Sequence, residues 1–220
     1  MGKIKGREMI AKRVAQEFEK DTVVNLGIGL PTLCANYISK ETNIMLQSEN
    51  GFVGIGPFPF VGEEDYDLIN AGGVPVTIVA GGAFFDSAIS FGIIRGGHIH
   101  STVLGAFEVD ESGNLANWMV PGKIVPGMGG AMDLVIGSRK VIVAMEHSVK
   151  GKPKILKKCT LPLTARNVVD LIVTDLAVIQ VTSRGLILKE IAPNLAIEDV
   201  IKVTEADLII PEEVKVIDVF

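Results

Sequence analysis

Residues 22–32 read TVVNLGIGLPT, a short apolar run that ends in a turn containing Gly27, Gly29 and Pro31. The apolar run predicts a β-strand over residues 22–26. The two glycines permit a sharp turn, and proline is typical of the first position of a helix, which we expect to run through Tyr37. A strand, a glycine turn and a helix in this order predict an α/β fold.

A second strand is predicted immediately downstream. Residues 44–47 are the largely apolar IMLQ, and they stop abruptly at Ser48-Glu49-Asn50-Gly51, where Asn-Gly predicts a tight turn. Glu49 is therefore expected at the carboxyl end of a strand, which is where open α/β sheets bind their ligands. The alternative is an ordinary carboxylate on a surface turn, and the local pattern leaves both interpretations open.

The remaining pattern predicts a mixed α/β sheet. Apolar residues at helical spacing indicate an amphipathic helix over residues 4–20. Continuous Val, Ile and Leu runs indicate buried strands in a sheet that is covered on both faces. We expect strands at 76–79, 102–109, 140–145, 169–173 and 177–181, helices at 85–94 and 197–203, and loops at 51–62, 70–75 and 121–130. No repeat or change of composition divides residues 1–220, so a single domain is predicted.

Composition excludes several classes of protein. Of the 220 residues, 48% are hydrophobic and 21% are charged, which is typical of folded chains rather than disordered ones. A net charge of -5 without a basic tract argues against nucleic acid or an anionic membrane as a partner. No apolar run reaches the ~18 residues of a membrane-spanning helix. Cys34 and Cys159 lack metal-ligand spacing and the N-terminus lacks a signal-peptide core, so we expect a reducing cytoplasm.

The glycine turn also has a cofactor interpretation. Gly27-x-Gly29-x-x-Thr32 is similar to a dinucleotide-binding fingerprint, and Glu49 follows Gly29 by 20 residues, near the offset of a ribose-binding acid. The third glycine is missing, however, and Pro31 occupies the turn. The alternative is that the glycines only permit a sharp passage from strand to helix.

A second glycine cluster, GMGGAMD, occupies residues 127–133. Consecutive glycines leave backbone N–H groups accessible, as an oxyanion hole or anion site requires, although a flexible loop has the same composition. His98 and His100 are two residues apart without a third ligand at suitable spacing, so no metal site is predicted. Serine-hydrolase and P-loop motifs are absent from the sequence.

Five motifs occur in order along the chain, within about residues 8–210. They are NLGIG (25–29), SENG (48–51), IRGGHI (94–99), ANWMVPGK (116–123) and GMGGAMD (127–133). Together they resemble the β subunit of family I CoA-transferases. The similarity is to the β subunits of acetate, butyrate or acetoacetate CoA-transferases and to the C-terminal half of fused succinyl-CoA:3-oxoacid enzymes. This resemblance implies a three-layer α/β/α fold.

The resemblance also implies a mechanism. Glu49 would be a nucleophile that carries CoA as a glutamyl thioester between two half-reactions, and the backbone N–H of Gly130 would stabilise the oxyanions. Coenzyme A would be a substrate, and neither a tightly bound cofactor nor a metal would be needed. The residues expected to line the CoA channel are Gly27, Gly29, Asn50, Gly51, Lys123 and Gly129.

A partner chain is implied as well. The glycine-rich CoA loop of the family's other half has no counterpart in this sequence, so the chain is expected to pair with an α subunit, as α2β2. The expected substrates are an acyl-CoA and a short-chain carboxylate or 3-oxoacid. One alternative is a transferase for dicarboxylates such as 3-oxoadipate or succinate, with Arg95 as the candidate cation for the distal carboxylate. A nicotinamide-dependent oxidoreductase is the alternative of a different class.

Overall fold

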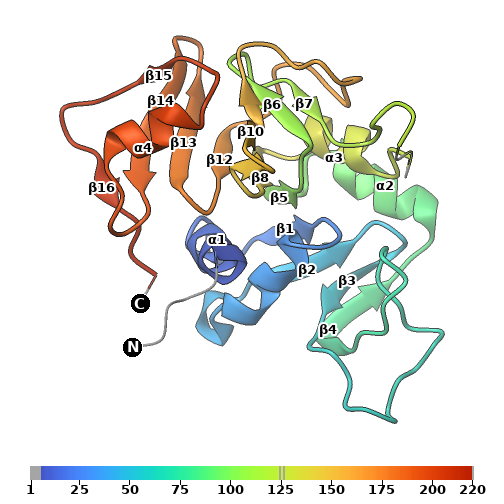
Figure 1. Cartoon of the computed structure of the whole chain (residues 1–220). Coiled ribbons are helices and arrows are strands. Elements are labelled where there is room, and N and C mark those ends of the chain that lie inside the picture. Colours follow the sequence, from blue (N-terminus) through green and yellow to red (C-terminus); the bar gives the residue numbers. More distant parts are fainter. Residues whose placement is uncertain (1–5, 124, 126, 220) are drawn as a thin grey trace.

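A large mixed β-sheet organises the computed structural model, which describes residues 6–123, 125 and 127–219 (Figure 1). Within those residues the sheet has eleven strands, and the five at its centre are parallel. Their order is β12 (Leu171–Val173), β8 (Lys140–Ala144), β5 (Ser101–Leu104), β1 (Val23–Leu26) and β2 (Met45–Ser48). Because parallel strands end at the same edge of a sheet, the carboxyl ends of β1, β2 and β5 are neighbours.

Antiparallel strands extend the sheet on both sides of this centre. Next to β2 lie β3 (Phe52–Ile55) and then β4 (Ile78–Phe84). Beyond β12 lie β13 (Ala177–Thr182) and β14 (Gly185–Ile191). The short strands β15 (Leu208–Ile209) and β16 (Lys215–Val216) pair with β14 in parallel.

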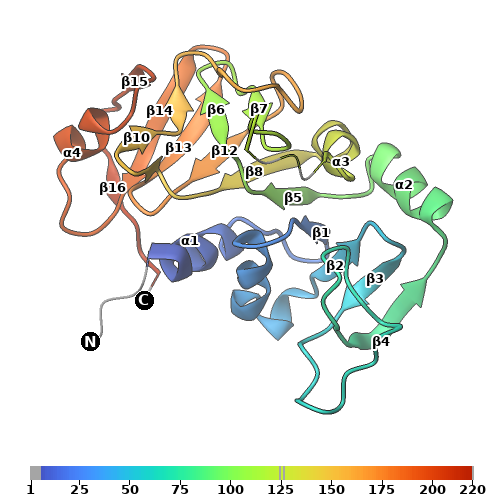
Figure 2. The same cartoon turned by 45° about the vertical axis from the view of Figure 1, so that its right-hand side comes forward.

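Helices pack on both faces of the sheet (Figure 2). One face contacts α1 (Gly6–Ala15) and the 3₁₀ helix η1 (Pro31–Tyr37), with η2 (Lys40–Thr42) following. The opposite face contacts α2 (Ser87–Arg95), α3 (Ala131–Gly137) and α4 (Ile197–Lys202). A three-stranded sheet of β6 (Glu108–Asp110), β7 (Leu115–Ala116) and β11 (Ile155–Leu156) joins this second layer, and β9 (Ser148–Val149) pairs with β10 (Lys152–Pro153).

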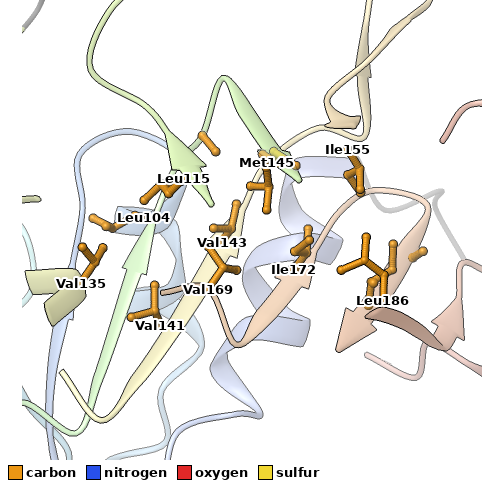
Figure 3. Packing of buried hydrophobic residues seen from close by; sticks show 14 of the residues in the cluster. Leu104, Leu115, Val135, Val141, Val143, Met145, Ile155, Val169, Ile172 and Leu186 are labelled. Atoms are coloured by element: carbon orange, nitrogen blue, oxygen red, sulfur yellow. The ribbon is translucent and has the colours of Figure 1, made fainter. Parts of the chain in front are cut away.

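Strand β8 shows how the sequence produces two cores. Val141 and Val143 pack in the cluster with α2, α3 and α4, whereas Ile142 and Ala144 pack in the cluster with α1. All four are buried, because side chains of a strand alternate between faces and both faces are covered. Figure 3 shows the first cluster around Val141 and Val143. The prediction of a mixed sheet covered on both faces is confirmed.

Two strand predictions and one loop prediction were wrong in detail. The strand predicted over 102–109 is two strands, β5 and β6, which belong to different sheets because the chain leaves the main sheet at Gly105. The loop predicted over 51–62 contains β3. The buried strand predicted over 76–79 is the later strand β4, whose residues are mostly exposed because it forms an edge of the sheet. The strand β14 and the helix α3 had no prediction.

The first helix is also shorter than predicted. Part of the range 4–20 lies outside the described residues, and α1 ends at Ala15, because Glu17 N bonds to Val14 O in a tighter turn. No helix in the described part of the chain is long and apolar enough to cross a membrane.

Candidate active site

Glu49 lies at the carboxyl end of β2, half-buried, in the turn that leads into β3. Its carboxylate faces β1, where Asn25 donates a hydrogen bond from Nδ2 to Glu49 Oε2 over 3.2 Å. Asn25 pairs in register with Gln47, two residues before Glu49. The parallel pairing of β1 and β2 thus brings the amide and the carboxylate to the same edge of the sheet.

A buried polar network supports Asn25. Its Nδ2 also donates to Gln47 Oε1 over 2.8 Å, and its Oδ1 accepts a 3.4 Å bond from Thr102 of β5. Gln47 Nε2 donates in turn to Ser90 Oγ of α2 over 3.0 Å. All four side chains are buried, so their hydrogen bonds fix the amide orientations and leave Asn25 presenting a donor to Glu49.

These four residues were missed by the sequence analysis. A signal for two of them exists, because Asn25 and Gln47 each place a polar side chain inside an apolar strand. Ser90 could not be found in this way, since a serine on a helix is ordinary. Its helix begins where the Asp86 carboxylate accepts a hydrogen bond from Ile89 N over 2.8 Å, which sets α2 two residues later than predicted.

The second glycine cluster meets Glu49. Gly130 is buried, and a Cβ at this position would lie 3.3 Å from Glu49 Cγ and 3.4 Å from the Phe91 ring. The Gly130 N–H has no hydrogen-bond acceptor among the residues that the structure describes. The loop reaches this position because α3, which follows it, packs against α2. The two helices are in close contact at Gly137, where a Cβ would overlap the Ile94 carbonyl oxygen. A side chain at Gly130 would therefore crowd the Glu49 side chain, and glycine avoids this.

The turn around Glu49 is held by backbone geometry and by a neighbouring loop. Gly51 has φ +135°, and a Cβ there would overlap the carbonyl oxygen of Phe85. Asn50 Nδ2 donates to Ile69 O over 2.7 Å, and Ser48 Oγ accepts a 2.9 Å bond from Ala71 N. Asn50 and Gly51 thus shape the turn, and their expected contacts with CoA stay predictions.

The other predicted channel residues lie at different distances from Glu49. Gly27 follows β1, donates its N–H to Val103 O over 2.8 Å and accepts from Thr32 Oγ1 over 3.1 Å, so it holds the glycine turn closed. Gly29 and Gly129 have positive φ angles of +92° and +52° and open space beside them. Lys123 lies in an exposed turn, and its ammonium makes no hydrogen bond or ion pair with any described residue. The structure does not bring Lys123 into contact with Glu49.

Arg95, the candidate cation, is next to the site but paired. Its Nε lies 2.7 Å from Asp133 Oδ1, and its guanidinium stacks 5.6 Å from the centre of the Phe91 ring. Phe91 is the ring that faces Gly130 and, through it, Glu49. Arg95 therefore supports Phe91, and Asp133 compensates its charge.

The histidines and cysteines form no second centre. His98 is exposed, and His100 Nε2 lies 3.3 Å from Glu19 Oε2. Burial lowers the pKa of His147 to about 4, and its ring contacts only Thr174 and Thr204 hydroxyls by hydrogen bonds. Burial raises the pKa of the Cys34 thiol to about 12. No group of three or more metal-ligating side chains occurs in residues 6–123, 125 and 127–219.

The fold and the site together define an α/β protein with a half-buried carboxylate at the end of a parallel strand, where open α/β sheets bind their ligands. A family model described as Coenzyme A transferase matches residues 7–203, so the chain belongs to the coenzyme A transferase family. Within that family it is a subunit of the β type.

Curated relatives support this assignment along nearly the whole chain. The β subunit of acetate CoA-transferase from Haemophilus influenzae is 55% identical over 95% of this chain and 94% of the relative. The corresponding subunit of a probable succinyl-CoA:3-ketoacid coenzyme A transferase from Bacillus subtilis is 52% identical over 94% of this chain and 97% of the relative. A mitochondrial succinyl-CoA:3-ketoacid transferase from mouse is 55% identical over 91% of this chain, which spans only 39% of the mouse protein.

Solved structures share the fold. An acyl-CoA transferase from Escherichia coli O157:H7 superposes with a TM-score of 0.78 at 24% identity, covering 100% of this chain and 45% of that chain. Glutaconate coenzyme A-transferase from Acidaminococcus fermentans has a TM-score of 0.74 at 18% identity, covering 99% of this chain and 90% of that chain. The predicted CoA-transferase-like fold is confirmed. Because the bacterial relatives are named as β-type subunits, an α partner is implied.

Proposed function

We propose that this chain is the nucleophile-bearing half of an enzyme that transfers CoA between an acyl-CoA and a short-chain carboxylate or 3-oxoacid, through a thioester on Glu49. The observation that carries the proposal is the juxtaposition of Glu49, the Asn25 amide and the buried Gly130. A carboxylate held by an amide donor beside a glycine backbone suits acyl exchange, which needs a nucleophile and donors for a developing oxyanion.

The proposed chemistry proceeds by two acyl exchanges. A Glu49 oxygen attacks the thioester carbonyl carbon, the C–S bond breaks, and a mixed anhydride and the CoA thiolate result. The thiolate attacks the γ-carbonyl carbon of Glu49, and the bond between that carbon and the bridging oxygen breaks. The first carboxylate then leaves with the electron pair, and glutamyl-CoA remains. An incoming carboxylate runs the same steps in reverse, without a net proton or electron change.

The residues of this chain have separate roles in the proposed reaction. Asn25 holds Glu49 with its carboxylate toward the substrate side of the strand ends. The Gly130 N–H is the proposed donor to the tetrahedral oxyanions. The proposed channel for CoA passes Gly29, Gly129 and Lys123, because these residues make few contacts of their own, whereas Gly27, Asn50 and Gly51 shape its wall.

Substitution of Gly130 tests whether its loop acts in the chemical step. We expect Gly130→Val to lower kcat by about 10²–10³, with a much smaller change in CoA affinity, because its side chain would crowd Glu49 and displace the backbone donor, and both groups act mainly in the transition state. Steady-state kinetics and CoA binding by calorimetry, both on the assembled complex, provide the two numbers. Gly92→Val on α2 is the matched control, because a side chain there meets open space. Equal losses of kcat and CoA binding would instead make the loop a simple ligand cradle.

The proposed assembly is α2β2, with coenzyme A as a substrate, no tightly bound cofactor and a cytoplasmic location. Two sets of initial rates of the complex test the function: acetyl-CoA as donor with butyrate, acetoacetate or succinate as acceptor, and acetoacetyl-CoA as donor with acetate as acceptor. We expect parallel double-reciprocal lines, as a covalent intermediate requires, and a preference for the monocarboxylates. Intersecting lines would contradict the mechanism, and a preference for succinate would favour the dicarboxylate alternative.

A further inference from the structure

An apolar arm projects from one end of the main sheet. This β3–β4 arm comprises residues 52–84, and the long loop between its strands extends away from the body of the molecule (Figures 1 and 2). Phe60 and Val61 in this loop are 80% and 99% exposed, and Phe84 at the end of β4 is 63% exposed. Phe58, Tyr66, Val74 and Val79 are exposed as well. So many large apolar side chains in water on a single protrusion indicate an interaction surface.

The arm is not built to add a strand from another chain. β4 is the edge strand, but Gly81 within it has φ +87°, and its pairing with β3 shifts register between Val53 and Ile55. Such irregularities interrupt the row of backbone groups that a further strand would need. A partner must therefore be held by side-chain contacts with the arm.

The charged residues of the arm indicate what kind of surface a partner must present. No lysine or arginine occurs between Lys40 and Arg95, whereas the arm carries Glu63, Glu64, Asp65 and Asp67 beside its apolar loop. None of these four carboxylates forms an ion pair with a described residue. A complementary surface therefore has an apolar centre and a rim of lysine or arginine.

Hydrogen bonds connect the arm region to the turn at residues 48–51, which carries Glu49. Phe85, directly after β4, donates its N–H to Gly51 O over 2.8 Å. Asn50 bonds to Ile69 O within the arm's loop. A protein bound to the arm therefore stands beside the turn that carries Glu49.

We propose that the β3–β4 arm is the docking surface for the α subunit, an inference that rests on the proposed function. This chain covers only 39% of the mouse relative and 45% of the Escherichia coli relative, so each of them carries further sequence that this chain lacks. Acyl exchange also requires Glu49 to be shielded from water, and a partner on the arm supplies a second wall next to it. The α subunit is thus expected to carry the apolar, basic-rimmed surface.

Charge insertion at the exposed loop tests this proposal. The double variant Phe60→Asp/Val61→Asp is co-expressed with the α subunit that accompanies this chain, and the complex is diluted while its subunit composition is followed by mass photometry. We expect the dissociation midpoint to rise by about 30-fold or more, the effect of losing a central apolar contact. The matched control is Val149→Asp, which places the same charge at an exposed apolar residue outside the arm. A midpoint within twofold of wild type would overturn the proposal.

Further measurements separate the possible failures. Circular dichroism and thermal unfolding of the double variant should match the wild type, because neither side chain is packed. Glu63→Lys/Asp65→Lys should reduce the salt dependence of association, and an unchanged salt dependence would contradict the basic rim. If the wild-type chain forms no complex with the α subunit, the proposed function fails. If the arm variants assemble with the α subunit as well as the wild type does, only the docking proposal fails. The same conclusion follows if the arm variants abolish a homodimer of the isolated chain instead of the complex with the α subunit.

Discussion

Replacing Glu49 with glutamine is expected to abolish CoA transfer, lowering kcat by about 10⁴-fold or more, because the covalent intermediates require this carboxylate. The amide has nearly the same shape and still accepts a hydrogen bond from Asn25, so assembly and thermal stability should be retained. Glu49→Ala should be equally inactive. Transfer from acetyl-CoA to acetoacetate by the purified complex measures the loss.

A shorter side chain at residue 49 tests whether the position of the carboxylate matters as well as its charge. Glu49→Asp retains the charge but is shorter by a methylene, and a misplacement of about 1 Å costs on the order of 10²-fold in rate. Glu198→Gln, on the exposed start of α4, is the matched control and should retain wild-type turnover. If Glu49→Ala kept more than a trace of activity, Glu49 would not be the nucleophile.

The second large effect concerns assembly. The isolated chain is expected to have no measurable transferase activity and to self-associate, whereas co-expression with its α subunit should give a soluble 1:1 complex with full activity. The chain carries Glu49 and Gly130, but its sequence has no glycine-rich CoA loop of the α type, and the β3–β4 arm leaves apolar surface exposed. Acetate- or acetoacetate-dependent transfer is measured for each preparation.

A complementation control makes the assembly result specific. The Glu49→Ala chain should form the same complex with its α partner and yet remain inactive, which separates assembly from chemistry. Robust turnover by the pure 220-residue chain alone would contradict the requirement for an α partner.

The position of Glu49 could be predicted because its causes are local. The apolar run of β2 and the Asn-Gly turn are both visible within residues 44–51, and together they place the carboxylate at a strand end. The covered sheet could be predicted for the same reason, since continuous apolar strands such as β8 report burial directly. The limits of β5 and β4 could not, because burial at a sheet edge depends on neighbours that are distant in sequence.

The remainder of the site depends on long-range contacts. Gly130 was predicted from a resemblance, and its approach to Glu49 depends on the packing of α3 against α2, which the local pattern does not report. The bond from Asn25 to Glu49 depends on which strands pair, and the bond from Gln47 to Ser90 depends on where α2 crosses the sheet. The Asn-Gly turn itself was predicted, but the bond from Asn50 to Ile69 depends on how a loop 19 residues downstream folds back onto that turn.

The most direct measurement of the central claim is the location of the covalent intermediate. The assembled complex is incubated with acetoacetyl-CoA alone, treated with borohydride or hydroxylamine, digested and analysed by peptide mass spectrometry. A glutamyl-CoA thioester predicts one modified peptide, with the modification at Glu49 and absent from the Glu49→Gln complex. Modification at any other residue, or full transferase activity without any covalent adduct, would contradict the account.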